Sequence, residues 1–222
     1  MNVTLSPRLN AAATLVRGGG VLADIGTDHA YLPVYLIQCG KITKAVAADI
    51  GKMPLLNAAE TVKRYSLYNE ISLRLSDGLC AFVPGEVSEI VFAGMGGTLI
   101  VQKLAETPWV KDPSLHFVFQ PQSRAEELRE YLYKNGFEIG TELAVHEGRR
   151  YYITFDAFYT GEMHDFSPVQ LFTGKLPHTE DACRHLRQQY CRLQKKYDAL
   201  SEGADKAYYA EILKGLEDFI NG

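Results

Sequence analysis

The stretch VLADIGTDHAYLP, residues 21–33, decides the fold class. An apolar run that begins at Val21 ends at Gly26, and a second apolar run with helical character extends from Ala30 to Cys39. A buried strand, a glycine turn and a helix in this order are typical of one unit of a parallel α/β sheet. Pro33 is compatible with the helix, because a proline in the first turn removes an N–H group that has no partner within the helix.

The same alternation continues on both sides of this stretch. Ser6-Pro7 predicts the start of a helix that ends at Gly18. Further strands are predicted at residues 44–50, 71–77, 89–94 and 116–121, with helices placed after the first, third and fourth of them. Two closely spaced runs, 141–146 and the Tyr/Phe/Ile-rich 149–158, predict an antiparallel hairpin around Glu147-Gly148. Five strand–helix steps and this hairpin predict a Rossmann-like, doubly wound α/β fold whose sheet is parallel except for one strand.

The chain changes character after residue 160. Residues 160–177 hold two prolines and two glycines. Beyond them, apolar residues recur every three or four positions from Ala182 to Leu200 and again from Tyr209 to Ile220. This spacing predicts two antiparallel α-helices in a short coiled-coil hairpin, and a helical pair packed back on the sheet is the alternative. We therefore divide the chain into a sheet domain, 1–160, and a helical hairpin, 161–222.

Composition excludes several classes of protein. The 222 residues are 46% hydrophobic and 23% charged, which is ordinary for a soluble globular protein. We expect no membrane association, because no apolar run reaches the length of a membrane span. The four cysteines form no C-x-x-C pair, which favours reduced thiols and a cytoplasmic location over disulfides or zinc. The net charge of −4 gives no argument for a nucleic-acid partner, and nothing in the sequence supports a homo-oligomer.

Carboxylates stand at the ends of three successive predicted strands. They are Asp24, Asp49 and Asp77, and the fourth strand ends in Gly94-Met95-Gly96-Gly97. Aspartate is disfavoured both in strands and in protein interiors, so packing does not explain this placement. Because ligands of open α/β sheets bind at the carboxyl ends of the strands, the pattern predicts a ligand site at this edge.

The acids suit a ligand that contains adenosine. Asp49 is placed to accept both ribose hydroxyls. Asp77 is placed to accept a hydrogen bond from the adenine amino group, and Gly78 beside it keeps the wall of the site thin. Gly26 lets the backbone pass close to the ligand.

The charge of Asp28 distinguishes between two ligands that contain adenosine, a nicotinamide dinucleotide and S-adenosylmethionine. Asp28 stands where a dinucleotide fingerprint has its second glycine, and a carboxylate there repels a pyrophosphate. S-adenosylmethionine carries a sulfonium and an ammonium group instead, which Asp24 and Asp28 attract. The sequence therefore predicts S-adenosylmethionine and disfavours an NAD-dependent oxidoreductase.

Simpler interpretations of the same residues exist. Asp28 and His29 are candidates to cap the helix that follows them. Asp24, Asp28, Asp49 and His29 include only one histidine, so we predict no metal site. Residues 94–97 fit an ordinary tight turn between a strand and a helix.

The segments LSPRL (5–9), ADIGTDHAYLP (23–33), DGL (77–79) and AGMGG (93–97) resemble those of class I S-adenosylmethionine-dependent methyltransferases. More narrowly, the sequence resembles the bacterial tRNA (adenine-22-N1)-methyltransferase family, which also has the helical hairpin. The resemblance implies methyl transfer to N1 of an adenine in the D-loop region of tRNA. The expected cofactor contacts are Asp24, Gly26, Thr27, Asp28, His29, Asp49, Ile50, Asp77, Gly78, Gly94 and Met95.

Two local features bear on the chemistry that the resemblance implies. The Asn/Asp-Pro-Pro-aromatic motif of many exocyclic-amine methyltransferases is absent after the fourth strand, which argues against methylation at N6. The family's Gln-Pro-Asn reads Gln120-Pro121-Gln122 here, so no role of that asparagine is carried over.

N1 of adenine has an in-plane lone pair, so the enzyme needs mainly to position it. We expect Asp28 to be catalytic, by stabilising the cationic methylated base, with pure cofactor binding as its competing role. Tyr31, Met95 and Gly96 are the predicted contacts of the target base.

Basic residues supply the predicted RNA contacts. They are Arg8, Arg149, Arg150, Arg184, Arg187, Lys195 and Lys196. The alternative for the last four is a solvated helix face. Two other functions stay open at this point: a small-molecule S-adenosylmethionine-dependent methyltransferase, and a non-catalytic RNA-binding protein with a pocket of the S-adenosylmethionine type.

Overall fold

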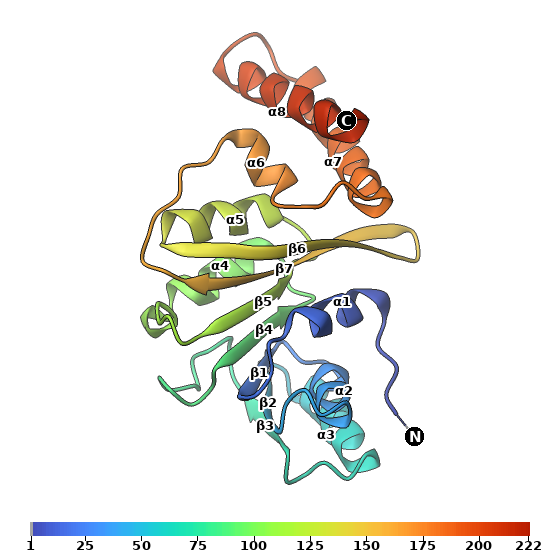
Figure 1. Ribbon diagram of the computed structural model, residues 1–222, viewed down its shortest axis with the longest axis vertical. Coiled ribbons are helices and arrows are strands. Elements are labelled where there is room, and N and C mark those ends of the chain that lie inside the picture. The colour runs from blue at the N-terminus through green and yellow to red at the C-terminus, as the bar shows by residue number, and fades with distance from the viewer. Residues whose placement is uncertain (1) are drawn as a thin grey trace.

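A seven-stranded sheet with the order β3-β2-β1-β4-β5-β7-β6 runs through the computed structural model, which describes residues 2–222 (Figure 1). Neighbours among the first five strands pair in parallel, and β7 pairs antiparallel with both β5 and β6. The predicted doubly wound sheet with one antiparallel strand is therefore confirmed. The strands are β1 (Val21–Ile25), β2 (Lys44–Asp49), β3 (Ile71–Leu75), β4 (Glu89–Ala93), β5 (His116–Gln120), β6 (Phe137–Glu147) and β7 (Arg150–Tyr159).

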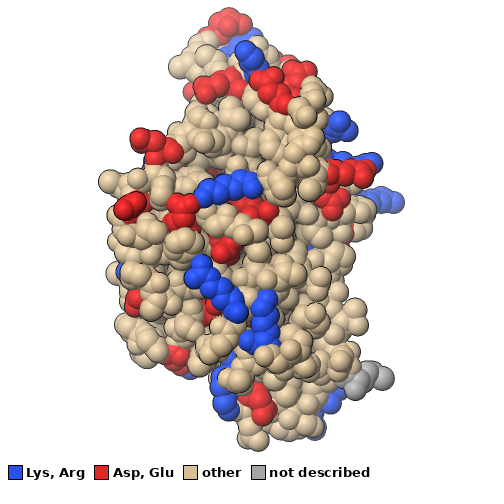
Figure 2. All heavy atoms as spheres, in the orientation of Figure 1, with Lys and Arg blue, Asp and Glu red and all other residues tan. Residues whose placement is uncertain are grey.

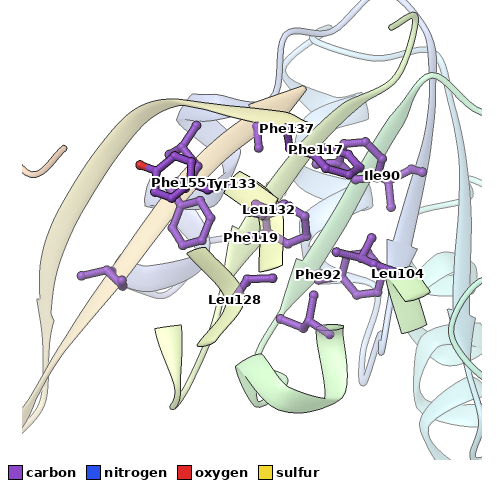
Figure 3. Close-up of a cluster of buried hydrophobic side chains, with 14 of the residues drawn as sticks. Ile90, Phe92, Leu104, Phe117, Phe119, Leu128, Leu132, Tyr133, Phe137 and Phe155 are labelled. Atoms are coloured by element: carbon purple, nitrogen blue, oxygen red, sulfur yellow. The ribbon is translucent and has the colours of Figure 1, made fainter. Parts of the chain in front are cut away.

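Helices cover both faces of the sheet (Figure 1). On one face lie α1 (Pro7–Leu15), α2 (Tyr31–Gln38) and α3 (Lys52–Arg64); on the other lie α4 (Gly97–Ala105) and α5 (Ala125–Lys134), with a short 3-10 helix, η1 (Pro108–Val110), after α4. Successive residues of a strand point to opposite faces, so the apolar strands supply two separate cores. Figure 3 shows the larger one, where aromatic side chains of β4, β5 and β7 pack against Leu128 and Leu132 of α5.

Three details differ from the sequence-based expectation. One strand–helix step lacks its helix, because residues 76–88, with Gly78, Pro84 and Gly85, form only turns between β3 and β4. Strand β6 begins at Phe137 rather than 141, since Phe137 and Ile139 are buried in the core and extend the pairing. A short helix, α6 (Pro168–Thr173), lies in the segment expected to be a linker, and Ser167 and Gln170 form its capping box.

The two C-terminal helices are α7 (Glu180–Asp198) and α8 (Ala204–Asn221). They pack against each other, and α7 also lies along β6 and β7 while α8 contacts α6. Leu186 and Leu193 of α7 and Leu216 of α8 belong to the same buried cluster as the sheet residues. The pair is thus packed back on the sheet, and the division of the chain at residue 160 stays a prediction.

Candidate active site

A small cavity opens at the carboxyl edge of the sheet, between the end of β1 and the start of α1. Its volume is about 90 Å³, and its lining comes from Arg8, Leu9, Asp24, Gly26, Thr27, Asp28, His29, Ala30, Tyr31, Leu32 and Ala93. The structure therefore brings together most of the residues predicted from the first strand and turn. Ligand pockets usually measure roughly 300–1,000 Å³, so this cavity suits one end of a larger ligand rather than all of it.

Asp24 is the buried carboxyl group of this cavity, with 6% of the residue exposed. Burial raises its pKa from 3.8 to about 6; a hydrogen bond with Thr27 opposes this and the nearby charge of Asp49 adds to it. Asp24 forms no ion pair with any residue from 2 to 222. A buried carboxylate without a cationic partner is unfavourable, and a cationic ligand relieves this.

The turn after β1 is held by Thr27 and made possible by Gly26. Thr27 is buried, and its Oγ1 accepts a hydrogen bond from the N–H of Ala30 at 3.1 Å. Gly26 has φ = 78°, and a Cβ there would lie 3.1 Å from Sδ of Met95. Met95 thus packs directly on the turn, which fits its predicted place beside the cofactor.

Asp28, His29 and Tyr31 form the rim of the cavity. The Oδ2 atom of Asp28 lies 3.2 Å from Nε2 of His29, and the side chain of Asp28 is 70% exposed. The rings of His29 and Tyr31 stack with centroids 5.0 Å apart. Neither Asp28 nor His29 caps α2, whose N-cap is Ala30 in the left-handed region with φ = 53°. The capping interpretation is therefore wrong, and Asp28 is left with its carboxylate at the mouth of the cavity.

The predicted adenosine contacts lie beside the cavity, at the ends of β2 and β3. The Oδ1 atom of Asp49 accepts the N–H of Gly51 at 2.6 Å, which fixes the carboxylate at the turn. Ile50 is 69% exposed, unusual for an isoleucine and suited to contact with a ligand ring. Asp77 is paired through Oδ2 with Nζ of Lys103 at 2.9 Å. Sequence reasoning missed Lys103, which lies 26 residues away on α4.

Gly78 is required where it stands. Its φ is 59°, and a Cβ there would lie 2.5 Å from Cδ of Lys103. The glycine thus lets the aliphatic part of Lys103 pass behind the β3 turn and reach Asp77.

Arg8 lies at the cavity rather than on an open RNA-binding surface. Its Nη1 donates to Oε1 of Gln120 at 3.1 Å, and its Nε lies 3.3 Å from Oε1 of Glu147. Gln120 is fully buried at the end of β5. Arg8 thus links α1, β5 and the β6–β7 turn at the mouth of the site. The sequence offered no signal for Glu147, which comes close only through the fold of the hairpin.

The loops after β4 and β5 are joined by backbone hydrogen bonds. The N–H of Gly94 donates to Gln120 O at 3.0 Å, and that of Gln122 donates to Met95 O at 2.9 Å. The N–H of Gly97 donates to Ser123 O at 2.7 Å. Gly94 and Gly96 therefore lie beside the Gln120–Ser123 loop.

The other predicted RNA contacts lie on the β6–β7 turn and on α7. Arg149 and Arg150 are exposed at the turn, and Arg187 and Lys195 are exposed on α7 without an ion-pair partner among residues 2–222. Arg184 pairs with Glu180 at 2.7 Å, and Nζ of Lys196 lies 5.9 Å from the ring centroid of Tyr209. On the face that Figure 2 shows, charges of both signs are interspersed over the upper half of the molecule.

Residues 2–222 form neither a metal-binding cluster nor a membrane-spanning helix. No group of three or more His, Cys, Asp or Glu side chains in this range is arranged to hold a metal ion. None of the described helices combines the length and apolarity needed to cross a membrane.

Comparisons with known proteins agree with the site. Residues 5–155 match the family model of a methyltransferase domain. The tRNA (adenine(22)-N(1))-methyltransferase of Bacillus subtilis is 33% identical over 223 residues, covering 96% of this chain and 93% of that protein. The chain belongs to the tRNA (adenine-22-N1)-methyltransferase family.

Solved structures of this family have the same fold over the whole chain. The B. subtilis m1A22 tRNA methyltransferase TrmK has a TM-score of 0.80 and 30% identity, with 99% of this chain and 97% of that chain covered. A Streptococcus pneumoniae protein assigned as a tRNA (m1A22) methyltransferase, solved in complex with S-adenosyl-L-methionine, has a TM-score of 0.85 and 26% identity, with 98% and 100% covered. The likeness includes the C-terminal helices as well as the sheet.

Proposed function

We propose that this protein transfers a methyl group from S-adenosylmethionine to N1 of adenine 22 in tRNA. The observation that carries this proposal is the similarity to the B. subtilis enzyme over 96% of the chain, which includes both the carboxyl-edge site and the C-terminal helices. A small-molecule methyltransferase shares the sheet but has no need of the helical part. A non-catalytic RNA-binding protein has no need of a buried, unpaired carboxyl group at the end of β1.

The residues at the carboxyl edge fit S-adenosylmethionine, which supplies an electrophilic methyl group on a sulfonium. Asp24, buried and without a cation, is suited to a positively charged end of the cofactor. Asp49, fixed by Gly51, is suited to the ribose, and Ile50 offers an exposed apolar surface to the adenine ring. Asp77 keeps one carboxylate oxygen available, because Lys103 is bound through Oδ2.

The protein's own part in the reaction is to position the base and to stabilise charge. N1 of adenine attacks with its lone pair, so no general base has to remove a proton from it first. The methylated base is a cation, and the exposed carboxylate of Asp28 at the cavity mouth stabilises positive charge there. Tyr31, half-exposed and stacked on His29, offers a ring face to the target base.

A tRNA substrate also accounts for the exposed cations of α7. Arg187 and Lys195 provide phosphate contacts, since both are exposed and unpaired among the described residues. The cytoplasmic location predicted from the sequence belongs to the same proposal, because the tRNA is found there.

The direct test is to incubate the protein with methyl-labelled S-adenosylmethionine and an unmodified tRNA transcript, and then to digest the RNA to nucleosides. We expect the label in 1-methyladenosine. Label in N6-methyladenosine or in a ribose-methylated nucleoside contradicts the atom assignment. Transfer that occurs only when a small-metabolite fraction replaces the RNA supports the small-molecule alternative.

A further inference from the structure

A second cavity in the described structure is separate from the cofactor site. It measures about 540 Å³ and lies between the loop after β5, the start of α5, β7 and α7. Its residues include Gln122, Tyr152, His185 and Gln189. This volume lies within the usual range for a pocket that holds a small organic group. We call it the β7–α7 groove.

The groove adjoins the catalytic edge. Gln122 lines it, and the amide nitrogen of the same side chain lies 3.5 Å from the Cβ position of Gly94. The backbone N–H of Gln122 donates a hydrogen bond to the carbonyl oxygen of Met95. A strand of RNA whose target base enters beside Met95 and Tyr31 therefore passes the opening of the groove with an adjacent nucleotide.

The charge of the groove favours an anion. Four arginines and one glutamate line it. The glutamate, Glu126, is bound to Arg192 at 3.3 Å, and Arg129 is paired with Glu142 at 2.8 Å beneath the floor. Arg150 has no ion-pair partner among residues 2–222. Its guanidinium is thus available for a phosphate.

The floor of the groove offers hydrogen-bond groups that the protein does not use up. His185 is 8% exposed, and its Nδ1 lies 3.1 Å from Tyr151 O, so Nδ1 carries the proton. Burial lowers the pKa of His185 to about 4, so the ring is neutral at pH 7 and Nε2 is an acceptor.

Gln189 adds a second polar group. Its Oε1 is buried and has no hydrogen-bond donor among the described residues. With no donor holding that oxygen, the amide can turn about its soft terminal torsion and offer either oxygen or NH₂ to a ligand.

Tyr152 adds an aromatic face. It is half-buried on β7, lines the groove, and makes no ring contact with any of residues 2–222. Unpaired bases of RNA are held in proteins by stacking on such rings and by hydrogen bonds to their edges.

We propose that the β7–α7 groove binds the base of one unstacked nucleotide next to the target adenosine, with its phosphate on Arg150. This inference rests on the proposed function and deepens it. The groove then selects the local loop conformation in which the target base is already out of its stack, in addition to the phosphate contacts along α7.

Two variants test the groove. Gln189→Leu removes the amide while keeping its size, and Arg150→Gln removes the charge. Each is expected to raise KM for unmodified tRNA by about five- to tenfold, with kcat and the Kd for S-adenosylmethionine unchanged. Lys214→Gln, an exposed cation on α8 outside the groove, is the matched control and stays within about twofold of wild type.

A second measurement distinguishes base binding from phosphate binding. In wild type, an abasic nucleotide on one side of the target adenosine is expected to raise KM at least as much as Gln189→Leu does. In Gln189→Leu protein the same abasic tRNA gives a smaller further increase than it gives in wild type, because the amide contact is already lost. An unchanged KM for both variants, or for abasic tRNA at both neighbouring positions, overturns the groove proposal while methylation itself persists. Absence of methylation by wild type overturns the proposed function instead.

Discussion

At the level of single residues, the carboxyl group of Asp24 couples proton binding to cofactor binding. Its pKa is about 6 without ligand, and a cationic cofactor lowers it by favouring the charged form. Binding below pH 6 must therefore release a proton. We expect the Kd for S-adenosylmethionine, measured by titration calorimetry, to rise about tenfold from pH 7 to pH 5. Asp24→Asn binds more weakly at pH 7 and loses this pH dependence; a flat wild-type profile contradicts the account.

The same carboxyl group lowers the stability of the ligand-free protein. Because the folded pKa lies above the usual 3.8, the contribution of Asp24 is fully present below pH 3.8 and is lost as the pH rises through about 6. The difference corresponds to roughly 3 kcal/mol at pH 7. Urea unfolding at pH 7 should show Asp24→Asn to be more stable than wild type by about 1–3 kcal/mol. A less stable variant would mean that the carboxylate is structurally required.

Asp28 is expected to act on turnover. Asp28→Asn keeps the size of the side chain but removes its charge from the cavity mouth, so kcat should fall about 10- to 100-fold with little change in the Kd for S-adenosylmethionine. Single-turnover methylation and calorimetry separate the two effects. The control is Asp165→Asn, which removes an exposed carboxylate away from the site. Full turnover with altered cofactor affinity alone would assign Asp28 to cofactor binding.

The local sequence predicted this part of the site well and the distant partners not at all. Asp24, Gly26, Thr27, Asp28 and Tyr31 are adjacent in the chain, so one strand and one turn bring them together. Lys103 and Glu147 reach Asp77 and Arg8 through tertiary contacts. No spacing in a single sequence encodes such contacts.

At the level of elements, the strands were predictable because parallel strands are buried on both faces and read as continuous apolar runs. The sequence-based predictions were wrong where tertiary packing determines where an element begins or whether it forms. The extra residues of β6 are held by pairing with β7, and α6 is too short to show a helical period. Helix α7 packs on β6 and β7 because its apolar residues belong to the same buried cluster as those of the sheet. Apolar residues spaced three and four apart are found both in a helix packed on a sheet and in a free-standing coiled coil, so the sequence pattern does not distinguish the two.

The outer face of α7 carries a prediction of its own. Arg187→Glu with Lys195→Glu should weaken tRNA binding about tenfold or more and lower the slope of log affinity against log salt by about one for each phosphate that is no longer neutralised. The matched control, Lys63→Glu with Lys214→Glu, changes the net charge equally on α3 and α8. Filter binding at several salt concentrations measures both. If the two double variants have the same tRNA affinity and the same salt dependence, the outer face of α7 is exposed to solvent and does not contact tRNA.

At the level of the whole molecule, a buried charge cluster joins β4, β5 and β7 at the edge opposite the site. His116 lies 3.0 Å from both Glu89 and Asp156, with Arg17 also near. Burial alone lowers the pKa of His116, but the hydrogen bonds to Asp156 and Glu89 together outweigh it, so its pKa is raised above 6.5. In its protonated form, His116 pairs with carboxylates of two neighbouring strands and so holds three strands together.

This cluster gives the protein a pH-dependent stability. The stabilisation is fully present below pH 6.5 and is lost as the pH rises through the folded pKa of His116. We expect Tm, from calorimetry, to fall as the pH rises above 6.5. His116→Gln and Asp156→Asn, although less stable, should each show a smaller fall. The same slope in all three proteins would show that another group is responsible.

The central claim is that the carboxyl-edge site methylates N1 of one adenine in the D-loop region. Primer extension on unmodified tRNA, after incubation with protein and S-adenosylmethionine, tests it most directly, because a methyl group at N1 blocks the pairing edge. We predict a cofactor-dependent stop next to adenine 22 that disappears when this adenine is replaced by guanine. Methyl transfer without any stop, or a stop that survives the replacement, contradicts the account.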